Sequence, residues 1–149
     1  MAFQAKRSGD RFRIHDGSVV PKGYSASYTA PAPTVGHLVK VDTATNDGVL
    51  RCAGGDPPYG MGYSINSGNG TISTLRFARI HSIVLEYQTA PALGDKIAAH
   101  GSSGTIPIDG VLRDRIITDN VDGVGTVTAL DSPLTGLCIV EFPAEQIGT

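Results

Sequence analysis

Short runs of β-branched and other apolar residues recur along the chain, each bounded by Gly, Ser, Asp or Pro. No window of a dozen residues has the 3.6-residue period of an amphipathic helix, whereas short apolar runs bounded by turn residues are typical of strands. The runs predict strands at 38–41, 49–53, 61–65, 71–78, 80–87, 94–99, 105–106, 123–128 and 137–142. We therefore expect an all-β fold, a small β-barrel or β-sandwich of short antiparallel strands, with under about a tenth of the chain in helices.

Turn sequences separate these runs. Asn46-Asp47-Gly48 and the Ser-Gly-Asn-Gly sequence at 67–70 suit the positive φ angles of tight turns. The His-Gly-Ser-Ser-Gly sequence at 100–104 is interpreted as a hairpin tip. Segment 106–117 contains both Pro and Gly, so it predicts a loop and a short strand rather than a helix.

Three pieces of the first half resemble later pieces in the same order. Residues 36–41 correspond to 94–99, 60–65 to 123–128, and 83–87 to 138–142, at offsets of 58, 63 and 55. Either the two halves arose by duplication, or six strands simply follow the same pattern rules. The sequence leaves both interpretations open.

The first 34 residues differ in character from the rest. Residues 1–23 carry five cations and two anions, a balance of +3, whereas the remaining 126 residues carry 7 cations and 12 anions, a balance of −5. Pro31 and Pro33 exclude a helix and favour extended chain. We therefore divide the chain into an extended, basic and proline-rich N-terminal arm, residues 1–34, and a β-barrel or β-sandwich body, residues 35–149.

The arm contains one alternating stretch, in which Phe12 and Ile14 fall on one side of a predicted strand and Arg11, Arg13 and His15 on the other. Such a strand is either an edge strand that its charges protect from aggregation, or a segment that adds to a partner's sheet. Because little of the arm can form a core of its own, we expect a neighbouring subunit or other partner to order it. The residues expected to bind that partner are Lys6, Arg7, Arg11, Phe12, Arg13, Ile14, Tyr24 and Tyr28.

Length and composition narrow the class of protein. At 149 residues the chain fits one domain that can bury a core without metal or disulfide support. A net charge of −2 gives no general attraction to nucleic acid or to an anionic membrane. No signal peptide and no apolar run of membrane-spanning length is expected, so synthesis is predicted to be cytosolic. Cys52 and Cys138 have no metal-type spacing, and Cys138, within an apolar run, is expected to pack as a small hydrophobic side chain.

The sequence offers little catalytic chemistry. The histidines, His15, His37, His81 and His100, each stand alone, without a Cys or carboxylate at zinc-site spacing. Ser102 and Ser103 do not form the nucleophile elbow of a hydrolase. The Gly-x-Gly steps at 60–62 and 123–125 lack the third glycine of a dinucleotide loop, and 119–123 lacks the spacing of a calcium loop. We predict no catalytic residue, cofactor or metal, and a protein that is not an enzyme.

A series of short motifs covers roughly residues 35–142. They are Gly36–Val41, Tyr59-Gly60-Met61-Gly62-Tyr63, Leu93-Gly94-Asp95-Lys96-Ile97, Gly123-Val124-Gly125-Thr126 and the apolar run 138–142. In this order the motifs resemble those of the head decoration, or cement, proteins of tailed bacteriophages. The chain departs from that pattern in its proline-rich lead at 24–33 and in an inserted stretch at 107–120.

The resemblance implies a structural virion protein that binds the outer surface of the capsid as an oligomer and stabilises it by bridging major capsid protein subunits. It implies a homotrimer, with a dimer as the alternative, and no direct contact with nucleic acid or membrane. The protein would be made in the host cytoplasm and act on the virion. The rival expectation is a non-catalytic β-barrel module of a larger assembly that binds carbohydrate or another ligand.

Overall fold

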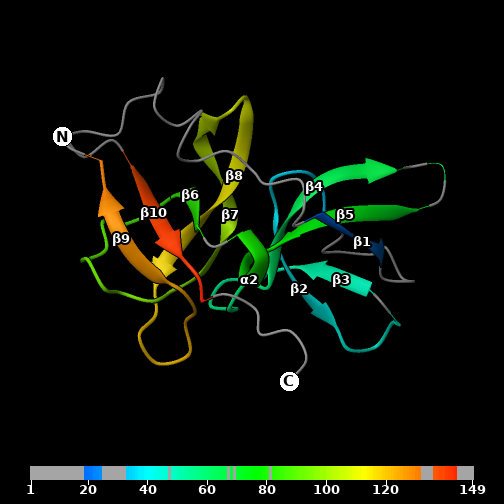
Figure 1. Ribbon diagram of the computed structural model, residues 1–149, viewed down its shortest axis with the longest axis horizontal. Helices are drawn as coiled ribbons and strands as arrows, with labels where there is room; N and C mark the ends of the chain where they lie inside the picture. Colours follow the sequence, from blue (N-terminus) through cyan, green and yellow to red (C-terminus); the bar gives the residue numbers. More distant parts are fainter. Residues whose placement is uncertain are drawn as a thin grey trace.

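The computed structural model describes residues 19–24, 33–46, 48–66, 68, 70–80, 82–131 and 136–143, with the side chains of 19–24, 66 and 79 left out. The fold is all-β, as predicted, and sandwich-like (Figure 1). The one helical segment of the described residues is a single turn, α2 (Phe77–Ile80). It separates β5 (Thr71–Arg76) from β6 (Ser82–Glu86) in the region predicted as a long strand pair or one bent strand at 71–87. No helix in the described part of the chain is long and apolar enough to cross a membrane.

The first five strands pair in a ring. They are β1 (Val19–Tyr24), β2 (Leu38–Asp42), β3 (Gly48–Arg51), β4 (Gly60–Asn66) and β5 (Thr71–Arg76). The order around the ring is β1-β3-β2-β4-β5, and all its pairings are antiparallel except β1 with β3. Two of the connections, from β2 to β3 and from β4 to β5, are short turns close to the predicted ones, and Gly70 in the second has a φ of 68°.

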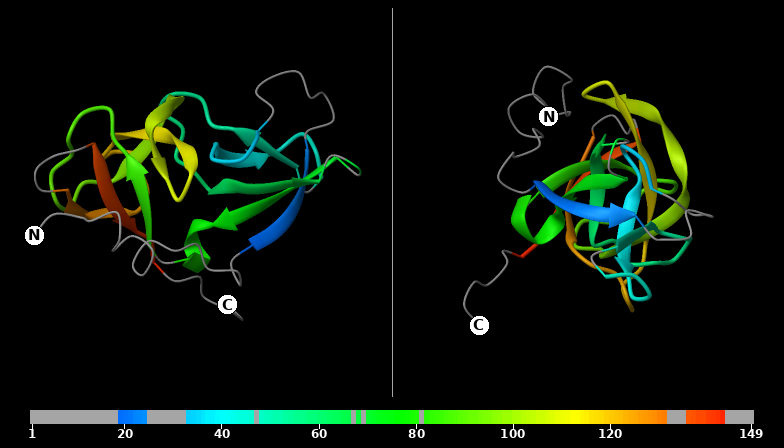
Figure 2. Two further views of the ribbon diagram at one scale, coloured as in Figure 1. Left: turned by 90° about the horizontal axis from the view of Figure 1, so that it is seen from above. Right: turned by 90° about the vertical axis from the view of Figure 1, so that its right-hand side faces the viewer.

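The remaining strands form two smaller sheets beside the ring. They are β6 (Ser82–Glu86), β7 (Ile97–Ile108), β8 (Val111–Thr118), β9 (Thr126–Leu130) and β10 (Leu137–Glu141). One sheet has the order β6-β10-β9, and the other is the β7–β8 hairpin. The ring and these sheets lie next to one another along the long axis, with α2 between them (Figures 1 and 2). The chain as a whole is therefore not a single closed barrel, although its first five strands close on themselves.

The hairpin corrects the prediction of a tip at 100–104. Strand β7 runs through that segment, and register shifts between Ala99 and Ser103 and between Ser103 and Pro107 absorb the extra residues. The turn lies instead at Asp109 and Gly110, with φ of 52° and 82°. Two consecutive positive φ angles are what a two-residue type I′ turn requires. Segment 106–117 is therefore mostly strand, where the sequence predicted a loop and a short strand.

Part of the segment predicted to be the arm contributes a strand to the ring. Strand β1 lies within the segment assigned to the arm, yet it pairs with β5 from Val19↔Leu75 to Gly23↔Thr71 and touches β3 at Tyr24↔Val49. It belongs to the ring, and Pro21 and Gly23 had weakened its strand signal in the sequence. Residues 1–18 and 25–32 of the predicted arm lie outside the described residues.

One apolar core runs from the ring into the second group of strands. Leu38 and Leu75 of the ring, Phe77 of α2, and Leu85 and Ile97 beyond it belong to the same buried cluster. Burying this many large side chains supplies the main driving force for folding, at about 25 cal/mol for each Å² of apolar surface removed from water. Because the cluster is continuous, the ring and the other sheets are packed as one body.

Three four-residue turns, at 34–37, 53–56 and 92–95, share one geometry. In each, the third residue is a glycine with φ between 89° and 92°. The fourth residue donates its backbone N–H to the carbonyl of the first, and its side chain accepts the N–H of the first. This explains the Gly-Asp and Gly-His pairs, since glycine permits the left-handed angle and the next side chain caps the turn. The first and third of these turns begin the two segments proposed to be related, whereas β6 and β10, also proposed to correspond, pair with each other. Duplication therefore stays a hypothesis.

Candidate functional site

An open groove of about 850 Å³ lies where α2 faces the start of β9 and the end of β10. Its walls are mostly apolar or small residues. The lining residues are Pro58, Tyr59, Phe77, Ala78, Lys96, Gly123, Val124, Gly125, Thr126, Thr128, Glu141, Phe142 and Pro143. Sites for small ligands and peptide segments typically have this size and apolar character.

Two stacked aromatic rings form part of the lining. The centroids of Phe77 and Phe142 are 4.5 Å apart, and the ring planes are inclined by 17°. Gly125 makes room for the second ring, because a Cβ atom there would lie 2.7 Å from a ring carbon of Phe142, and its φ of 69° also favours glycine. The glycine of the 123–126 motif is thus explained by the packing of an aromatic wall.

The polar part of the lining is small. Lys96 and Glu141, both exposed, are the only charged residues among the lining residues. Tyr59 is held by Arg76, whose guanidinium carbon lies 5.6 Å from the centre of the tyrosine ring. Such a contact stabilises the ring by roughly 0.5–1 kcal/mol at an exposed site. The groove therefore offers a mostly apolar surface with few charges, in which Tyr59 is the half-buried aromatic ring and Phe77 and Phe142 are buried.

Two hydrogen-bonded turns adjoin this groove. The turn at 92–95 and the turn at 119–122 are joined by Asn120, whose side chain donates to Asp95 at 3.1 Å and accepts from the backbone N–H of Lys96 at 2.8 Å. Each turn carries an exposed apolar side chain, Leu93 at 66% exposure and Val121 at 89%. The next residues along the chain, Lys96 and Gly123, line the groove. The hydrogen bonds through Asn120 fix the two turns relative to each other, so two exposed apolar side chains lie on turns that adjoin the groove.

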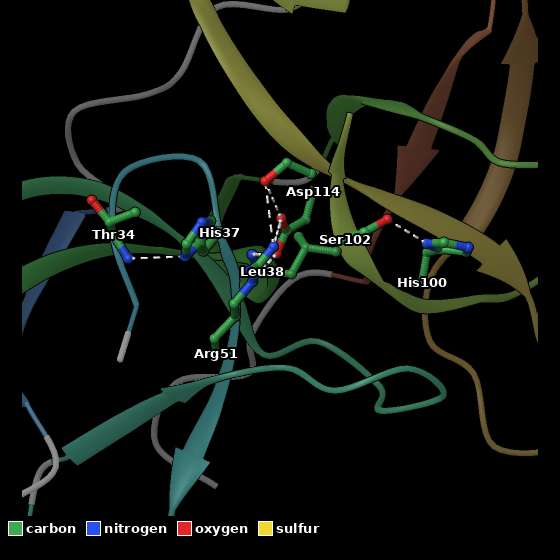
Figure 3. Close-up of polar contacts among 8 residues, drawn as sticks. Thr34, His37, Leu38, Arg51, His100, Ser102 and Asp114 are labelled. Atoms are coloured by element: carbon green, nitrogen blue, oxygen red, sulfur yellow. Dashed lines mark hydrogen bonds and ion pairs between the residues drawn. The ribbon is translucent and has the colours of Figure 1, made fainter. Parts of the chain in front are cut away.

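Buried charges elsewhere serve to hold strands together. Asp114 of β8 accepts two hydrogen bonds from Arg51 of β3, at 2.7 and 3.1 Å, and one from the backbone N–H of Leu38 at 3.0 Å (Figure 3). The Asp114 side chain is 1% exposed and that of Arg51 23%. This ion pair fastens the hairpin to the ring.

A second pair repeats the arrangement on the other side of β8. Glu86 of β6 accepts the backbone N–H groups of Thr105 and Ile106 at 2.8 and 2.7 Å, and Arg115 donates to it at 2.7 Å. The Glu86 side chain is 5% exposed. It fastens the hairpin to the sheet of β6, β10 and β9.

Arg113, which directly precedes these two charged residues of β8, has a different environment. Its Nη1 donates to the carbonyl of Val84 at 2.7 Å, whereas its Nε and Nη2 are buried without a hydrogen-bond partner among the described residues. Burial lowers the pKa of Arg113 to about 10, although the charge of Asp109 acts in the opposite direction. A buried guanidinium with two nitrogens that find no acceptor costs stability rather than adding to it.

The described histidines do not form a catalytic arrangement. His100 Nδ1 lies 2.7 Å from Ser102 Oγ (Figure 3), but among the described residues no carboxylate binds the other ring nitrogen of His100. His37 Nδ1 accepts the backbone N–H of Thr34 at 3.2 Å. Burial lowers the pKa of His37, Asp114 opposes this, and Arg51 adds to it, so the ring favours its neutral form. His15 and His81 lie outside the described residues.

The cysteines and carboxylates give no metal site. Cys52 and Cys138 are free and buried, and burial raises the pKa of each to about 12. Within the described ranges, no three His, Cys, Asp or Glu side chains come together as a metal ion would need. The predictions that the protein needs no cofactor and is not an enzyme stay predictions.

The predicted partner-binding residues are not brought to the groove by the described structure. Tyr24 ends β1, where only its backbone is described, paired with Val49. The others lie outside the described residues: Lys6, Arg7, Arg11, Phe12, Arg13, Ile14 and Tyr28. Sequence reasoning missed the groove, because Tyr59, Phe77 and Phe142 are far apart in the chain and no pattern links them.

No family model, no curated protein and no solved structure matches this chain. The fold and the groove therefore define the protein only as a class: an all-β protein with a rigid body and an open, mostly apolar groove.

Proposed function

We propose that the protein is a structural virion protein that binds the outer surface of a tailed-phage capsid as an oligomer and stabilises it by bridging major capsid protein subunits. The observation that carries the proposal is the use of its buried charges. The Arg51–Asp114 and Arg115–Glu86 pairs each join strands of different sheets, and neither opens into the groove. These ion pairs make the body rigid and are not part of a site where a substrate would react.

Rigidity matters for a bridging protein. A shell is strengthened when one stiff body contacts several subunits, because weak contacts that act together give a high combined affinity. A body whose sheets could slide past each other would lose this gain. The two ion pairs anchor the hairpin on both sides, and the continuous core keeps the two groups of strands together.

The proposal also specifies the oligomeric state and the arm residues that make the contacts. We favour a homotrimer on the virion surface, with a dimer as the alternative, made in the host cytoplasm. The arm residues Arg11, Phe12, Arg13 and Ile14 would contribute cations and apolar anchors to the contact with the capsid or with a neighbouring subunit. Fully buried apolar anchors contribute roughly 1.5–3 kcal/mol each, and exposed charges roughly 0–1 kcal/mol, so binding would weaken only modestly with salt.

Binding to undecorated capsids tests the proposal. The full chain should saturate at a fixed ratio to the capsid subunits and raise the temperature at which the capsids release their contents. A second sample should lack residues 1–17, because a longer deletion would remove β1 from the ring. If this shorter chain binds as tightly as the full chain, the arm is passive. A monodisperse monomer without affinity for capsids would refute the proposal.

The groove also favours a second candidate, a non-catalytic module that binds carbohydrate or another small ligand. Its volume of about 850 Å³ lies within the usual range of ligand sites, and Tyr59 offers a ring to a sugar face. Glycan-array binding that is lost in Tyr59→Ala but kept in the control Tyr63→Ala, outside the groove, would support this module. The absence of saturable binding would exclude it for the glycans tested.

A further inference from the structure

The register of β1 points to what fills the groove. Val19 pairs with Leu75 in an antiparallel sense. Continuing β1 backwards from Val19 therefore leads in the direction in which the chain runs on from Leu75 into α2. Two residues of α2, Phe77 and Ala78, line the groove. The line of the strand, extended beyond Val19, therefore points towards the groove.

We propose that the groove is the seat of segment 11–15 of the same chain, with Phe12 and Ile14 as the inserted side chains. Ile14 precedes Val19 by five residues, a length that spans up to about 17 Å when extended. This reach is short enough to keep the segment on its own body. The inference goes beyond the proposed function: it assigns Phe12 and Ile14 to the chain's own body in place of the capsid contact, leaves that contact to Arg11 and Arg13, and does not depend on capsid binding.

The chemistry of the groove and the segment agrees. Phe12 and Ile14 alternate with Arg11 and Arg13, so an extended segment has one apolar face. The more exposed apolar lining residues, among them Tyr59, Val124 and Pro143, give that face a surface to cover, and the buried stacked rings of Phe77 and Phe142 support it from below.

The local charge also favours a cationic segment. Glu141, exposed, lines the groove, and Asp119 and Asp122 lie in the adjoining turn. Lys96 is the one cation among the lining residues. Seated in this way, the segment would turn its arginines outwards, and this face would meet the capsid, a consequence that rests on the proposed function.

Disulfide trapping in the full chain tests the seat. The variant Ile14→Cys/Thr126→Cys places one thiol in the segment and one on an exposed lining residue, and the control Ile14→Cys/Ala44→Cys uses an exposed residue of the β2–β3 turn. The native cysteines interfere little, because both are buried and their raised pKa leaves few thiolates. Mild oxidation should give at least about tenfold more disulfide in the first variant, within a monomer.

Each other outcome overturns the proposal. Equal yields in the two variants would show that the segment has no preference for the groove. A disulfide-linked dimer would assign the groove to the segment of a second copy. Because no capsid is present, these outcomes are independent of whether the protein decorates one.

A second measurement uses the reactivity of Thr126→Cys alone in the full chain. A thiol reagent should label it at least about tenfold faster when Phe12→Ser and Ile14→Ser are added, because the apolar anchors no longer hold the segment over it. The control pair Ala2→Ser and Ala5→Ser should leave the rate unchanged. An unchanged rate in the anchor variant would contradict the proposal.

Discussion

Arg51 and Asp114 stand 63 positions apart in the chain, and the arginine binds both carboxylate oxygens of the aspartate, at 2.7 and 3.1 Å. This one pair connects the ring to the β7–β8 hairpin. The neighbouring backbone makes it a fixed joint, because the N–H of Leu38 donates to the same carboxylate and the N–H of Asp114 donates to the carbonyl of Gly36. A two-point ion pair of this kind sets the orientation of the strands as well as their distance.

The joint predicts a large effect of Asp114→Ala. The substitution leaves the guanidinium of Arg51 and the N–H of Leu38 without their acceptor, so we expect a loss of about 3 kcal/mol in the free energy of unfolding. Urea unfolding measures it. The matched control is Asp122→Ala, an exposed carboxylate, which should change stability by less than about 0.5 kcal/mol. Equal effects of the two substitutions would contradict the role given to the pair.

Arg113 and Arg115 of β8 are separated by one residue, and replacing them should change the free energy of unfolding in opposite directions. Arg113→Met removes a buried charge with two nitrogens that find no acceptor, so we expect a gain of about 1–2 kcal/mol in the free energy of unfolding. Arg115→Met leaves Glu86 buried without its cation, and we expect a loss of about 2–3 kcal/mol.

The pH dependence of the Arg113 variant gives a further check. The pKa of Arg113 is lowered to about 10 in the folded protein from an ordinary 12.5, so the unfolded chain binds the proton more tightly. The buried charge therefore lowers the free energy of unfolding by its full amount below about pH 10. This destabilisation decreases as the pH rises through that value. The gain from Arg113→Met should be present at neutral pH and shrink in alkali. If the gain in stability does not change with pH, removal of the Arg113 charge is not its cause.

Glycine at position 104 should be needed for the second ion pair. A Cβ atom there would lie 2.5 Å from Oε1 of Glu86 and 2.8 Å from the carbonyl oxygen of Arg113, so Gly104→Ala must displace the carboxylate. We expect a loss of about 2–3 kcal/mol. Gly55→Ala is the control for backbone strain alone, since its Cβ would meet nothing within 4 Å although φ is 92°, and it should cost about 1 kcal/mol. Thermal unfolding of the two variants would compare the loss that includes displacement of the Glu86 carboxylate with the loss from backbone strain alone. A crystal structure of Gly104→Ala would show the displaced carboxylate.

Acid should weaken the capped turns. The hydrogen bond from Lys40 is the main cause that lowers the pKa of Asp56 below its ordinary 3.8, and the N–H of Ala92 does the same for Asp95. A carboxyl whose pKa is lower in the folded state stabilises the protein fully above its unfolded pKa, and this contribution is lost as the pH falls through the folded value. Stability should therefore fall below about pH 3.8.

The double variant Asp56→Asn/Asp95→Asn should lose less stability than the parent chain between about pH 6 and about pH 2.5, because it has no proton to take up at these sites. Asp122→Asn is the control and should follow the parent. Urea midpoints across this range provide the measurement, and parallel curves for parent and double variant would contradict the assignment.

Sequence pattern predicted the strand class and most strand positions, because alternation and turn residues act locally. It predicted the strands at 38–41 and 61–65 within one residue of β2 and β4. It placed the hairpin tip at 100–104 wrongly, because the Gly and Ser residues there form bulges within β7, and sequence alone does not distinguish a bulge from a turn.

Sequence pattern could not predict contacts between residues far apart in the chain. Nothing near Val19 in the sequence indicates that β1 pairs with β5, and nothing near Asp114 indicates Arg51. The aromatic groove depends on Phe77 and Phe142, which sequence places in unrelated segments. Such contacts depend on the packing of the whole fold, whereas turn capping at Asp95 depends on only four consecutive residues and could be read as a motif.

The ring has a consequence for how the protein is made. Strand β1 leaves the ribosome before the other strands of the ring, yet it has to lie between β3 and β5, and β5 ends at Arg76. The sheet β3-β2-β4-β5 can form from neighbouring segments, and β1 then closes it through a contact of long sequence separation, the slower kind of step in folding. Until that step, β3 and β5 present free edges on which a strand of another chain can pair. Nascent chains on one messenger are therefore most prone to exchange strands in the interval before β1 takes its place.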